Sequence, residues 1–536
     1  MTAADLVIRG TVLTVDDAQP TAEALAVADG RIVAVGSRAD VDTWVGPGTR
    51  TLDLGDGCVM PGLVEAHGHP LMEAIVLSER MVDIRPVTLR DAAAVVDAIT
   101  HEVAAQGSAG AYLNGWDPLL QPGLPDPTLD WLDAQAPDTP LVIVHNSGHK
   151  AFFNSVAARK SGLTRDTPDP KGARYGRDAD GELDGTAEEI AAVFSLLGGV
   201  IDPADYPAML HAELRRLNKA GLTTCSDMAF DPVFWPVLER VRKDLTVRLR
   251  VYEVSTAQMH TEMTPANGDD LLRQVGIKIW VDGSPWVGNI DLSFPYLDTE
   301  ATRTIGVAPE SCGHANYTRA QLTEIVHAYF SKGWPMACHV HGDAGVDTIL
   351  DVYEEALRRW PRDDHRLRLE HVGAISDEQL QRAHALGVTC SLFVDQIHYW
   401  GDIIVDGLFG PEHGSRWMPC GSAIATGMRI SLHNDPPVTP EEPLRNIGVA
   451  ATRTAPSGRV IGPEQRITVE QAIRAQTLDA AYQLFADDVV GSLEVGKYAD
   501  MVVLSADPRA VRPDEIADLD VRATFLAGRQ VYPKED

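Results

Sequence analysis

Positive charge is scarce in this 536-residue sequence, which carries 46 Lys and Arg against 77 Asp and Glu and has a formal net charge of −31. This balance argues against a nucleic acid or an anionic membrane as a partner, because both repel an acidic protein. The sequence also lacks an apolar run long enough to cross a bilayer. We therefore expect no membrane partner, and the ordinary apolar fraction of 44% predicts a sizeable core.

Cysteines are few, and no two of them have the spacing of a paired motif. Most of the six lie in apolar runs, which is typical of buried free thiols in a reducing compartment. They are Cys58, Cys225, Cys312, Cys338, Cys390 and Cys420. The first residues lack the basic stretch and apolar core of a signal peptide, so we expect a cytoplasmic protein.

Two histidines one residue apart follow an apolar pair in the segment Leu63-Val-Glu-Ala-His67-Gly-His69. In a β-strand the side chains at i and i+2 point the same way, so both imidazoles would face one point. Imidazole is a ligand that suits zinc and similar divalent metals. The alternative is a pair of histidines at a strand end with no shared role, and the motif alone leaves both interpretations open.

Apolar runs separated by turn signals divide the chain. Residues 4–54 and 491–532 contain short strands with turns between them, and they predict one β-sandwich built from both termini. Between them, apolar runs alternate with helical patterns such as 318–330, which Thr318 would cap. The expected strands are 63–69, 221–227, 246–252, 276–283, 335–339, 366–371, 387–393 and 429–435. Eight such strands predict an α/β protein with a (β/α)8 barrel.

The predicted domain boundaries are 1–58 and 487–536 for the two halves of the sandwich and 59–486 for the barrel. About 150 residues (70–220) separate the first barrel strand from the second, far more than a simple crossover needs. This stretch holds an apolar run at 141–144 and a region rich in Gly and Asp at 169–185. We expect an inserted subdomain folded over the barrel mouth, with Thr186 capping a helix that starts near Glu188 and Glu189.

Active sites of such barrels lie at the carboxyl ends of the strands, and the polar residues expected there are informative. Four imidazoles, one lysine and one carboxylate would meet in one cavity and satisfy two zinc ions at three or four ligands each, with room for water. The six residues are His67, His69, Lys278, His339, His371 and Asp435.

Two members of this set have alternative roles. Burial among apolar residues and metal cations should lower the pKa of Lys278, and a neutral amine can add carbon dioxide to become a carbamate that bridges two metals. The alternative is an ion pair between Lys278 and Asp282. Asp435 either caps a local turn or binds metal through one oxygen and moves a proton with the other, and its place opposite four histidines favours catalysis.

In combination these motifs resemble amidohydrolase family 3 of the amidohydrolase superfamily, the YtcJ-like group related to N-substituted formamide deformylase, over nearly the whole chain. The motifs are Asp29-Gly-Arg-Ile-Val-Ala-Val-Gly36, Met60-Pro-Gly-Leu-Val-Glu-Ala-His-Gly-His69, Gly148-His149, Asp282-Gly-Ser284, Gly342-Asp343, Glu370-His371, Asp435-Pro-Pro-Val438, Gly491-Ser-Leu-Glu-Val-Gly-Lys497 and Ala499-Asp500. The resemblance implies that the six residues above are the metal and catalytic set. It also implies that His149 and Trp116-Asp117 line the substrate pocket.

The sequence departs from the family pattern at three places. His341 stands where an apolar residue is usual, and it would be an extra proton donor or a competing ligand. Glu65 replaces an aspartate before the histidine pair. The segment 394–402 is longer than usual, so we expect His398 and Tyr399 to contact substrate. Asp343 either orients a histidine of the set or caps the following helix.

The resemblance implies an enzyme that hydrolyses a C–N bond of a small molecule, in an amide, N-formyl, carbamate or cyclic amide group, through metal-activated hydroxide with Asp435 moving the proton. The implied cofactors are one or two divalent metal ions, Zn²⁺ above all, with N6-carboxylysine at position 278. Hydrolysis of a lactone or ester, or a deamination, is one alternative. A non-catalytic regulatory protein that binds metal on the same scaffold is another. The family also suggests a homodimer.

Overall fold

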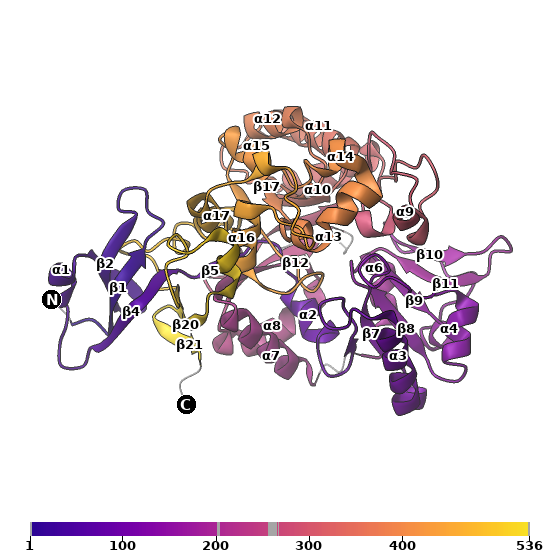
Figure 1. The fold of residues 1–536 in the computed structure, drawn as a ribbon, viewed down its shortest axis with the longest axis horizontal. Coiled ribbons are helices and arrows are strands. Elements are labelled where there is room, and N and C mark those ends of the chain that lie inside the picture. Colours follow the sequence, from indigo (N-terminus) through magenta and orange to yellow (C-terminus); the bar gives the residue numbers. More distant parts are fainter. Residues whose placement is uncertain (1–2, 201–203, 256–264, 266, 534–536) are drawn as a thin grey trace.

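The computed structural model describes residues 3–200, 204–255, 265 and 267–533, and three β-sheets organise it (Figure 1). The central sheet has the order β18-β17-β16-β15-β14-β13-β12-β5, and all its pairings are parallel. Its strands are β5 (Leu63–Glu65), β12 (Leu222–Phe230), β13 (Arg248–Val254), β14 (Leu272–Trp280), β15 (Met336–Val340), β16 (Arg368–His371), β17 (Thr389–Leu392) and β18 (Ile430–Leu432). The predicted (β/α)8 barrel is therefore confirmed.

The barrel is nearly closed, and a side chain spans the seam between its first and last strands. Glu65, at the end of β5, is fully buried, and its Oε2 accepts a hydrogen bond from the backbone N–H of Asn434 at 3.2 Å. Its Oε1 accepts from the backbone N–H of His67 at 3.1 Å. The longer side chain that replaces the family's usual aspartate thus joins the two edges of the barrel.

Helices cover the outside of the barrel. They include α7 (Tyr206–Lys219), α8 (Trp235–Val241), α10 (Arg319–Phe330), α11 (Asp343–Arg359), α12 (Asp377–Ala385), α13 (Asp395–Ile403), α16 (Pro443–Thr452) and α17 (Val469–Ala475). As predicted, Thr318 caps α10, in a capping box with Gln321. Helix α11 buries Val346, Ile349 and Tyr353 at helical spacing, so its apolar stripe faces the barrel core.

Both ends of the chain meet in a second sheet, of order β21-β20-β19-β4-β1-β2-β3. Its strands are β1 (Leu6–Leu13), β2 (Thr21–Ala28), β3 (Arg31–Gly36), β4 (Arg50–Pro61), β19 (Met501–Leu504), β20 (Val521–Leu526) and β21 (Arg529–Tyr532). The two ends combine as expected, but they are joined edge to edge by the antiparallel ladder between β4 and β19, in which Val59 lies opposite Val503. Ile8, Val59 and Phe525 share one apolar core on this sheet.

The insertion forms the third sheet, of order β10-β11-β9-β8-β7-β6. It comprises β6 (Val82–Asp83), β7 (Ala111–Trp116), β8 (Leu141–His145), β9 (Lys150–Phe153), β10 (Arg174–Arg177) and β11 (Leu183–Glu188), with helices α2 (Pro70–Val76), α3 (Ala92–Gln106), α4 (Leu129–Gln135), α5 (Ser155–Lys160) and α6 (Ile190–Leu196). The helix predicted near Glu188 and Glu189 is α6, which begins at Ile190 with Glu189 at its N-cap position, but the prediction that Thr186 caps it was wrong. Residue 188 ends a strand that pairs with β9 and β10, and this long-range pairing outweighs the local capping pattern around Thr186.

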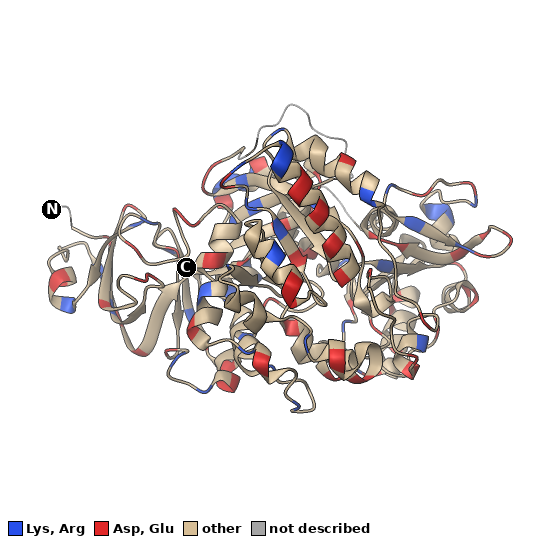
Figure 2. Cartoon of the chain, turned by 90° about the horizontal axis from the view of Figure 1, so that it is seen from above, with Lys and Arg blue, Asp and Glu red and all other residues tan. Residues whose placement is uncertain are grey.

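In the view of Figure 2, acidic residues recur along helices in several parts of the chain, with basic residues interspersed. The acidic residues are therefore not confined to one segment. Within the described ranges, none of the helices has an apolar stretch long enough to cross a membrane.

Candidate metal centre

The two histidines that follow the first barrel strand lie in a turn, not on the strand. Strand β5 ends at Glu65, and His69 immediately precedes α2, which starts at Pro70. The i, i+2 argument for their common direction was therefore wrong. The pair nevertheless converges, because Nε2 of His67 lies 3.6 Å and Nε2 of His69 lies 3.2 Å from the same oxygen, Asp435 Oδ1.

All six residues of the predicted set meet at the carboxyl end of the barrel. The ring centroid of His371 lies 4.5 Å from that of His67 and 4.5 Å from that of His339. Lys278 Nζ lies 3.1 Å from His67 Nε2, and Asp435 Oδ2 lies 3.8 Å from His371 Nδ1. The backbone of Asp435 has φ of +51°, a strained region for a residue with a side chain.

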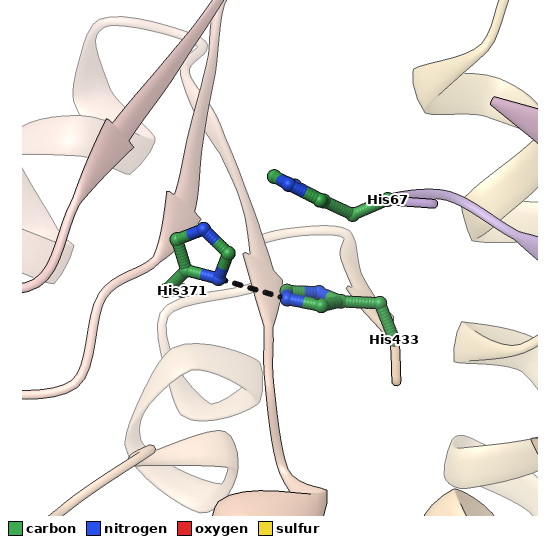
Figure 3. Close-up of side chains that lie close together, drawn as sticks. All are labelled: His67, His371 and His433. Atoms are coloured by element: carbon green, nitrogen blue, oxygen red, sulfur yellow. Dashed lines mark hydrogen bonds between the residues drawn. The ribbon is translucent and has the colours of Figure 1, made fainter. Parts of the chain in front are cut away.

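Sequence reasoning missed a seventh member of this cluster, His433. Its Nε2 lies 3.1 Å from His371 Nδ1, its Nδ1 lies 2.8 Å from Ser391 Oγ, and its ring stacks on that of His67 with centroids 4.8 Å apart. Figure 3 shows the three imidazoles of His67, His371 and His433 entering one space from different directions. The available signal was position, since this residue comes directly after β18 and two residues before Asp435.

A buried ion pair orients His67 from behind. Glu370 Oε2 lies 2.6 Å from His67 Nδ1 and accepts from an Arg368 guanidinium nitrogen at 2.8 Å. Both charged side chains are fully buried. Because a carboxylate only accepts, Nδ1 of His67 carries the hydrogen and Nε2 is free to bind a metal. At His339 the Nε2–H donates to the Gly283 carbonyl at 2.7 Å, so the lone pair of Nδ1 is the one available to bind a metal.

The electrostatics of the cluster favour neutral ligands. Burial lowers the pKa of His67, His339 and His371 well below the ordinary histidine value, and neighbouring groups lower it further. Burial also lowers the pKa of Lys278 to about 8, against the opposing effect of Glu370. The alternative ion pair of this lysine with Asp282 does not form, because Asp282 accepts from the backbone N–H groups of residues 341, 342 and 291.

The buried polar atoms at this site fit a divalent cation. Among the described residues, His69 Nδ1, His341 Nδ1 and His371 Nε2 are buried without a hydrogen-bond partner, which costs about 1–3 kcal/mol each if nothing satisfies them. Three groups of residues at this site each offer three ligand atoms that lie within 4.8 Å of one another. The groups are His67 with His371 and His433, His339 with His341 and His371, and His67 with His69 and Asp435. Imidazole nitrogens with a carboxylate oxygen are the donor set of zinc and related metals.

Two of the predicted substrate-binding residues border this centre. His149 packs on His339, with ring centroids 4.9 Å apart, and its Nδ1 lies 2.9 Å from Glu189 Oε2. The other oxygen of Glu189 accepts from Asn289 Nδ2 at 3.0 Å. Burial lowers the pKa of His149, but the charge and hydrogen bond of Glu189, together with the charges of Asp435 and Asp282, outweigh burial and the net shift is upward. His341 stacks on His371 with centroids 4.7 Å apart and an interplanar angle of 8°.

The remaining predicted residues do not line the cavity at the histidines. Trp116 packs against Trp131 and Phe152. Asp117 accepts from the backbone N–H groups of residues 119 and 120 and so fixes a loop. Tyr399 contacts Arg445 at 2.5 Å, and the His398 ring lies edge-on to Tyr399.

The acid Asp343 was expected to orient a histidine or to cap a helix. Its carboxylate instead accepts from the backbone N–H of Ser293 at 2.8 Å and from the hydroxyl of the same residue. Asp343 therefore fixes the loop at 293 against the start of α11.

The cavity in front of the histidines is lined by polar and apolar residues. Asn114, Asn146 and Ser147 of the insertion are polar lining residues, with His149. Much of the apolar lining comes from α2 and α6 of the insertion and the residue after α6, and it includes Met72, Val76, Ile190, Val193, Phe194 and Leu197. Residues of the insertion thus line the site, and the predicted boundaries of an inserted subdomain over the barrel mouth stay a prediction.

Comparisons with known proteins agree with this geometry. A model of the amidohydrolase family matches residues 50–532. The protein LONG AFTER FAR-RED 3 of Arabidopsis thaliana is 28% identical over 98% of this chain and 91% of its own length. N-substituted formamide deformylase of Arthrobacter pascens is 26% identical over 99% and 98%. A crystal structure described as an uncharacterized metal-dependent hydrolase from Pyrococcus horikoshii superposes with a TM-score of 0.75 at 22% identity, covering 95% of this chain and 99% of the other.

Proposed function

Since this chain belongs to the amidohydrolase family, we propose that it is a metal-dependent hydrolase that cleaves a C–N bond of a small molecule, in an amide, N-formyl, carbamate or cyclic amide group. One observation carries the proposal. The carboxylate of Asp435 lies 3.2–3.8 Å from nitrogens of His69, His67 and His371 and borders the cavity. The arrangement places a carboxylate that can accept a proton directly beside three imidazoles that can bind a metal.

The metal-binding part of the proposal rests on ligand chemistry. His67, His69 and Asp435 would hold one divalent cation, and His339 with His371 would hold a second, with Lys278 as its carbamate between them. A cation at such a site lowers the pKa of a water molecule and polarises a carbonyl group. Lys278 supports this role, because its amine lies beside His67 and its lowered pKa brings the neutral form that adds carbon dioxide within reach.

Asp435 is the proposed proton carrier. Its Oδ1 faces the first histidine pair and its Oδ2 faces His371, so one oxygen is available to accept a proton while the other stays among the ligands. Its side chain is 14% exposed, which gives it access to the cavity. We propose that it takes the proton of the attacking water and delivers it to the leaving nitrogen.

His149 is proposed to stabilise the charge that develops on the substrate oxygen. Glu189 holds Nδ1 and raises the pKa of the imidazole, which favours the protonated ring, and Asn289 holds the carboxylate in turn. Nε2 is then a charged donor on a cavity wall with little water around it. A donor placed in such a site stabilises an oxyanion more than it does in water.

The cavity walls support a substrate with an apolar substituent. The Arthrobacter relative is named for N-substituted formamides, in which a small acyl group is joined to a substituted nitrogen. In this chain apolar lining residues such as Met72, Ile190 and Phe194 would contact such a substituent while polar groups of the lining hold the carbonyl. The expected cytoplasmic location and the homodimer stay predictions.

The test combines metal analysis with a substrate panel. Purified protein should contain a divalent metal, and it should hydrolyse some members of a panel of N-acyl, N-formyl, carbamate and cyclic amide compounds. Asp435→Asn should fold normally and lose turnover. Turnover of only lactones, esters or aminated rings would replace the C–N assignment by another hydrolytic one. Absence of metal, together with full activity of Asp435→Asn, would remove the proposal.

A further inference from the structure

Three glutamates converge at a place separate from the histidines. Glu73 lies on α2, Glu213 lies on α7, and Glu441 lies in the loop before α16. One carboxylate oxygen of each lies within 4.8 Å of the others. Helices α2 and α7 pack together, and the loop that follows Asp435 completes the cluster.

Burial makes this cluster unusual. The side chain of Glu73 is 0% exposed, and within the described part of the chain neither of its oxygens has a hydrogen-bond donor, unless a proton is shared with Glu441. Glu213 is also 0% exposed, and Arg216 forms an ion pair with it. Arg85 is the other nearby cation, but Asp83 binds its Nε at 2.9 Å and the Pro437 carbonyl binds another of its nitrogens at 3.0 Å. The three carboxylates are therefore faced by the charge of Arg216 and by that of Arg85, which is shared with Asp83.

An ionised carboxylate without partners is costly to bury, so the cluster requires neutralisation. Burial raises the pKa of Glu73 well above its ordinary value, and the charge of Glu441 raises it further. Protons shared among the acids are one solution. A bound cation is the other, and it would also supply partners for the two oxygens of Glu73.

We propose that Glu73, Glu213 and Glu441 bind a divalent cation that prefers oxygen ligands, with Ca²⁺ as the best match. Ca²⁺ accepts oxygen ligands in a flexible geometry, whereas Mg²⁺ requires a nearly ideal octahedron and gives up its water reluctantly, so carboxylates held on three separate segments suit Ca²⁺ better. The cluster contains no imidazole, so it differs in chemistry from the histidine centre and selects a different class of metal.

The position of the cluster indicates its purpose. Helix α2 begins directly after His69, and Glu441 follows Asp435 by six residues. A cation held by both segments and by α7 ties together the two chain segments that carry ligands of the histidine centre. The proposed cation therefore has a structural role beside the site.

The experiment uses the full chain, loaded with zinc and desalted, and titrated with CaCl₂ while thermal unfolding is followed by calorimetry. We expect a saturable rise in melting temperature and one equivalent of Ca²⁺ per chain by atomic emission after equilibrium dialysis. Glu441→Gln, in a partly exposed loop, should weaken Ca²⁺ binding about tenfold or more, as expected when one of three charged ligands is lost. Glu73→Gln should do the same if it folds.

Glu79→Gln is the matched control, because it removes the same charge from an exposed position just beyond α2. This variant should keep the full response to Ca²⁺. The proposal fails if the melting temperature of the wild-type protein is insensitive to Ca²⁺, Mg²⁺ and Mn²⁺, since shared protons then neutralise the cluster. It also fails if Glu79→Gln loses the response as much as Glu441→Gln does. Zinc content and turnover are measured in parallel, so failure of this site is distinguishable from failure of the histidine centre.

Discussion

The two ends of the barrel use the same kind of buried ion pair in different ways. At the end away from the histidines, Arg248 starts β13 and binds Asp500 of the terminal sheet through Nε at 2.7 Å and a second nitrogen at 3.0 Å. At the other end, Arg368 binds Glu370 within β16, and Glu370 also holds His67 at 2.6 Å. The further hydrogen bonds of the first pair go to backbone groups, the N–H of Ala527 and the carbonyl of Asp270, whereas the second pair holds a side chain that borders the cavity.

This difference shows how an identical interaction acquires a role from its position. Both pairs are almost fully buried, so neither is explained by surface charge. In barrels of this type the carboxyl ends of the strands carry the chemistry and the opposite ends carry stability. The pair at Asp500 is expected to anchor the terminal sheet to the barrel, and the pair at Glu370 to set the orientation of a metal ligand.

The largest effect is expected at the cavity end. Asp435→Asn keeps the shape of the side chain but removes the proton acceptor, so kcat/KM should fall by roughly 10²–10⁴-fold with little change in melting temperature. Steady-state kinetics on an active substrate measures this. Asp343→Asn is the control, because that carboxylate binds Ser293 away from the histidines, and it should retain activity. Equal losses in both variants would contradict the assignment.

At the opposite end, Asp500→Asn should act on stability. The change leaves Arg248 buried without a charged partner, which costs about 3–5 kcal/mol of unfolding free energy. Denaturant unfolding measures the loss, while kcat per folded molecule should be unchanged. Asp53→Asn, an exposed acid in the same sheet, should be nearly neutral. If Asp500→Asn lost turnover while its unfolding free energy stayed unchanged, the assignment of stability to this end of the barrel would be wrong.

Glu370→Gln tests whether the second pair acts on the metal ligand. The amide cannot hold Nδ1–H of His67 as strongly, so metal affinity or activity should fall by about 10–100-fold. Competition with a chelator measures the affinity. Because Arg368 also loses its counter-charge, the free energy of unfolding will fall as well. The informative quantity is the loss of metal affinity relative to the loss of stability. If Glu370→Gln loses stability but keeps its metal affinity, Glu370 has a purely structural role, as we expect for Asp500.

The smallest effect concerns pH. Glu189 raises the pKa of His149, so the protonated ring and its stabilising contact are fully present below the unfolded histidine pKa and are lost as pH rises through the folded pKa. If the protonated ring assists turnover, the alkaline limb of kcat/KM reports this loss. Glu189→Gln should move that limb to lower pH, and a pH–rate profile measures the shift. An unchanged limb would exclude His149 as its origin.

Much of the barrel was predictable because its strands are buried on both faces and appear as short apolar runs. Each of the eight expected runs overlaps a strand, from β5 at residue 63 to β18 at residue 432. Polar residues at their ends identified the six members of the set that meet at the mouth. The family's pattern added His149, which borders the cavity, and Trp116, which does not.

The parts that sequence reasoning missed depend on contacts between distant segments. Strand β5 is only three residues long, so the histidine pair owes its direction to the turn held by Glu65. His433 was overlooked because its role arises from its stacking on His67, 366 positions earlier. At Thr186, strand pairing with β9 overrides a local capping signal. Periodicity within one segment contains no information about such partners.

The ladder between β4 and β19 has a consequence for biosynthesis. Val59 is translated 444 residues before its partner Val503, an interval of roughly 20–90 s at about 5–20 residues per second. During that interval β4 can pair with β1, but the edge that β19 covers in the folded protein has no partner, and an open edge is a template for foreign strands. We therefore expect that edge to need shielding while the rest of the chain is made.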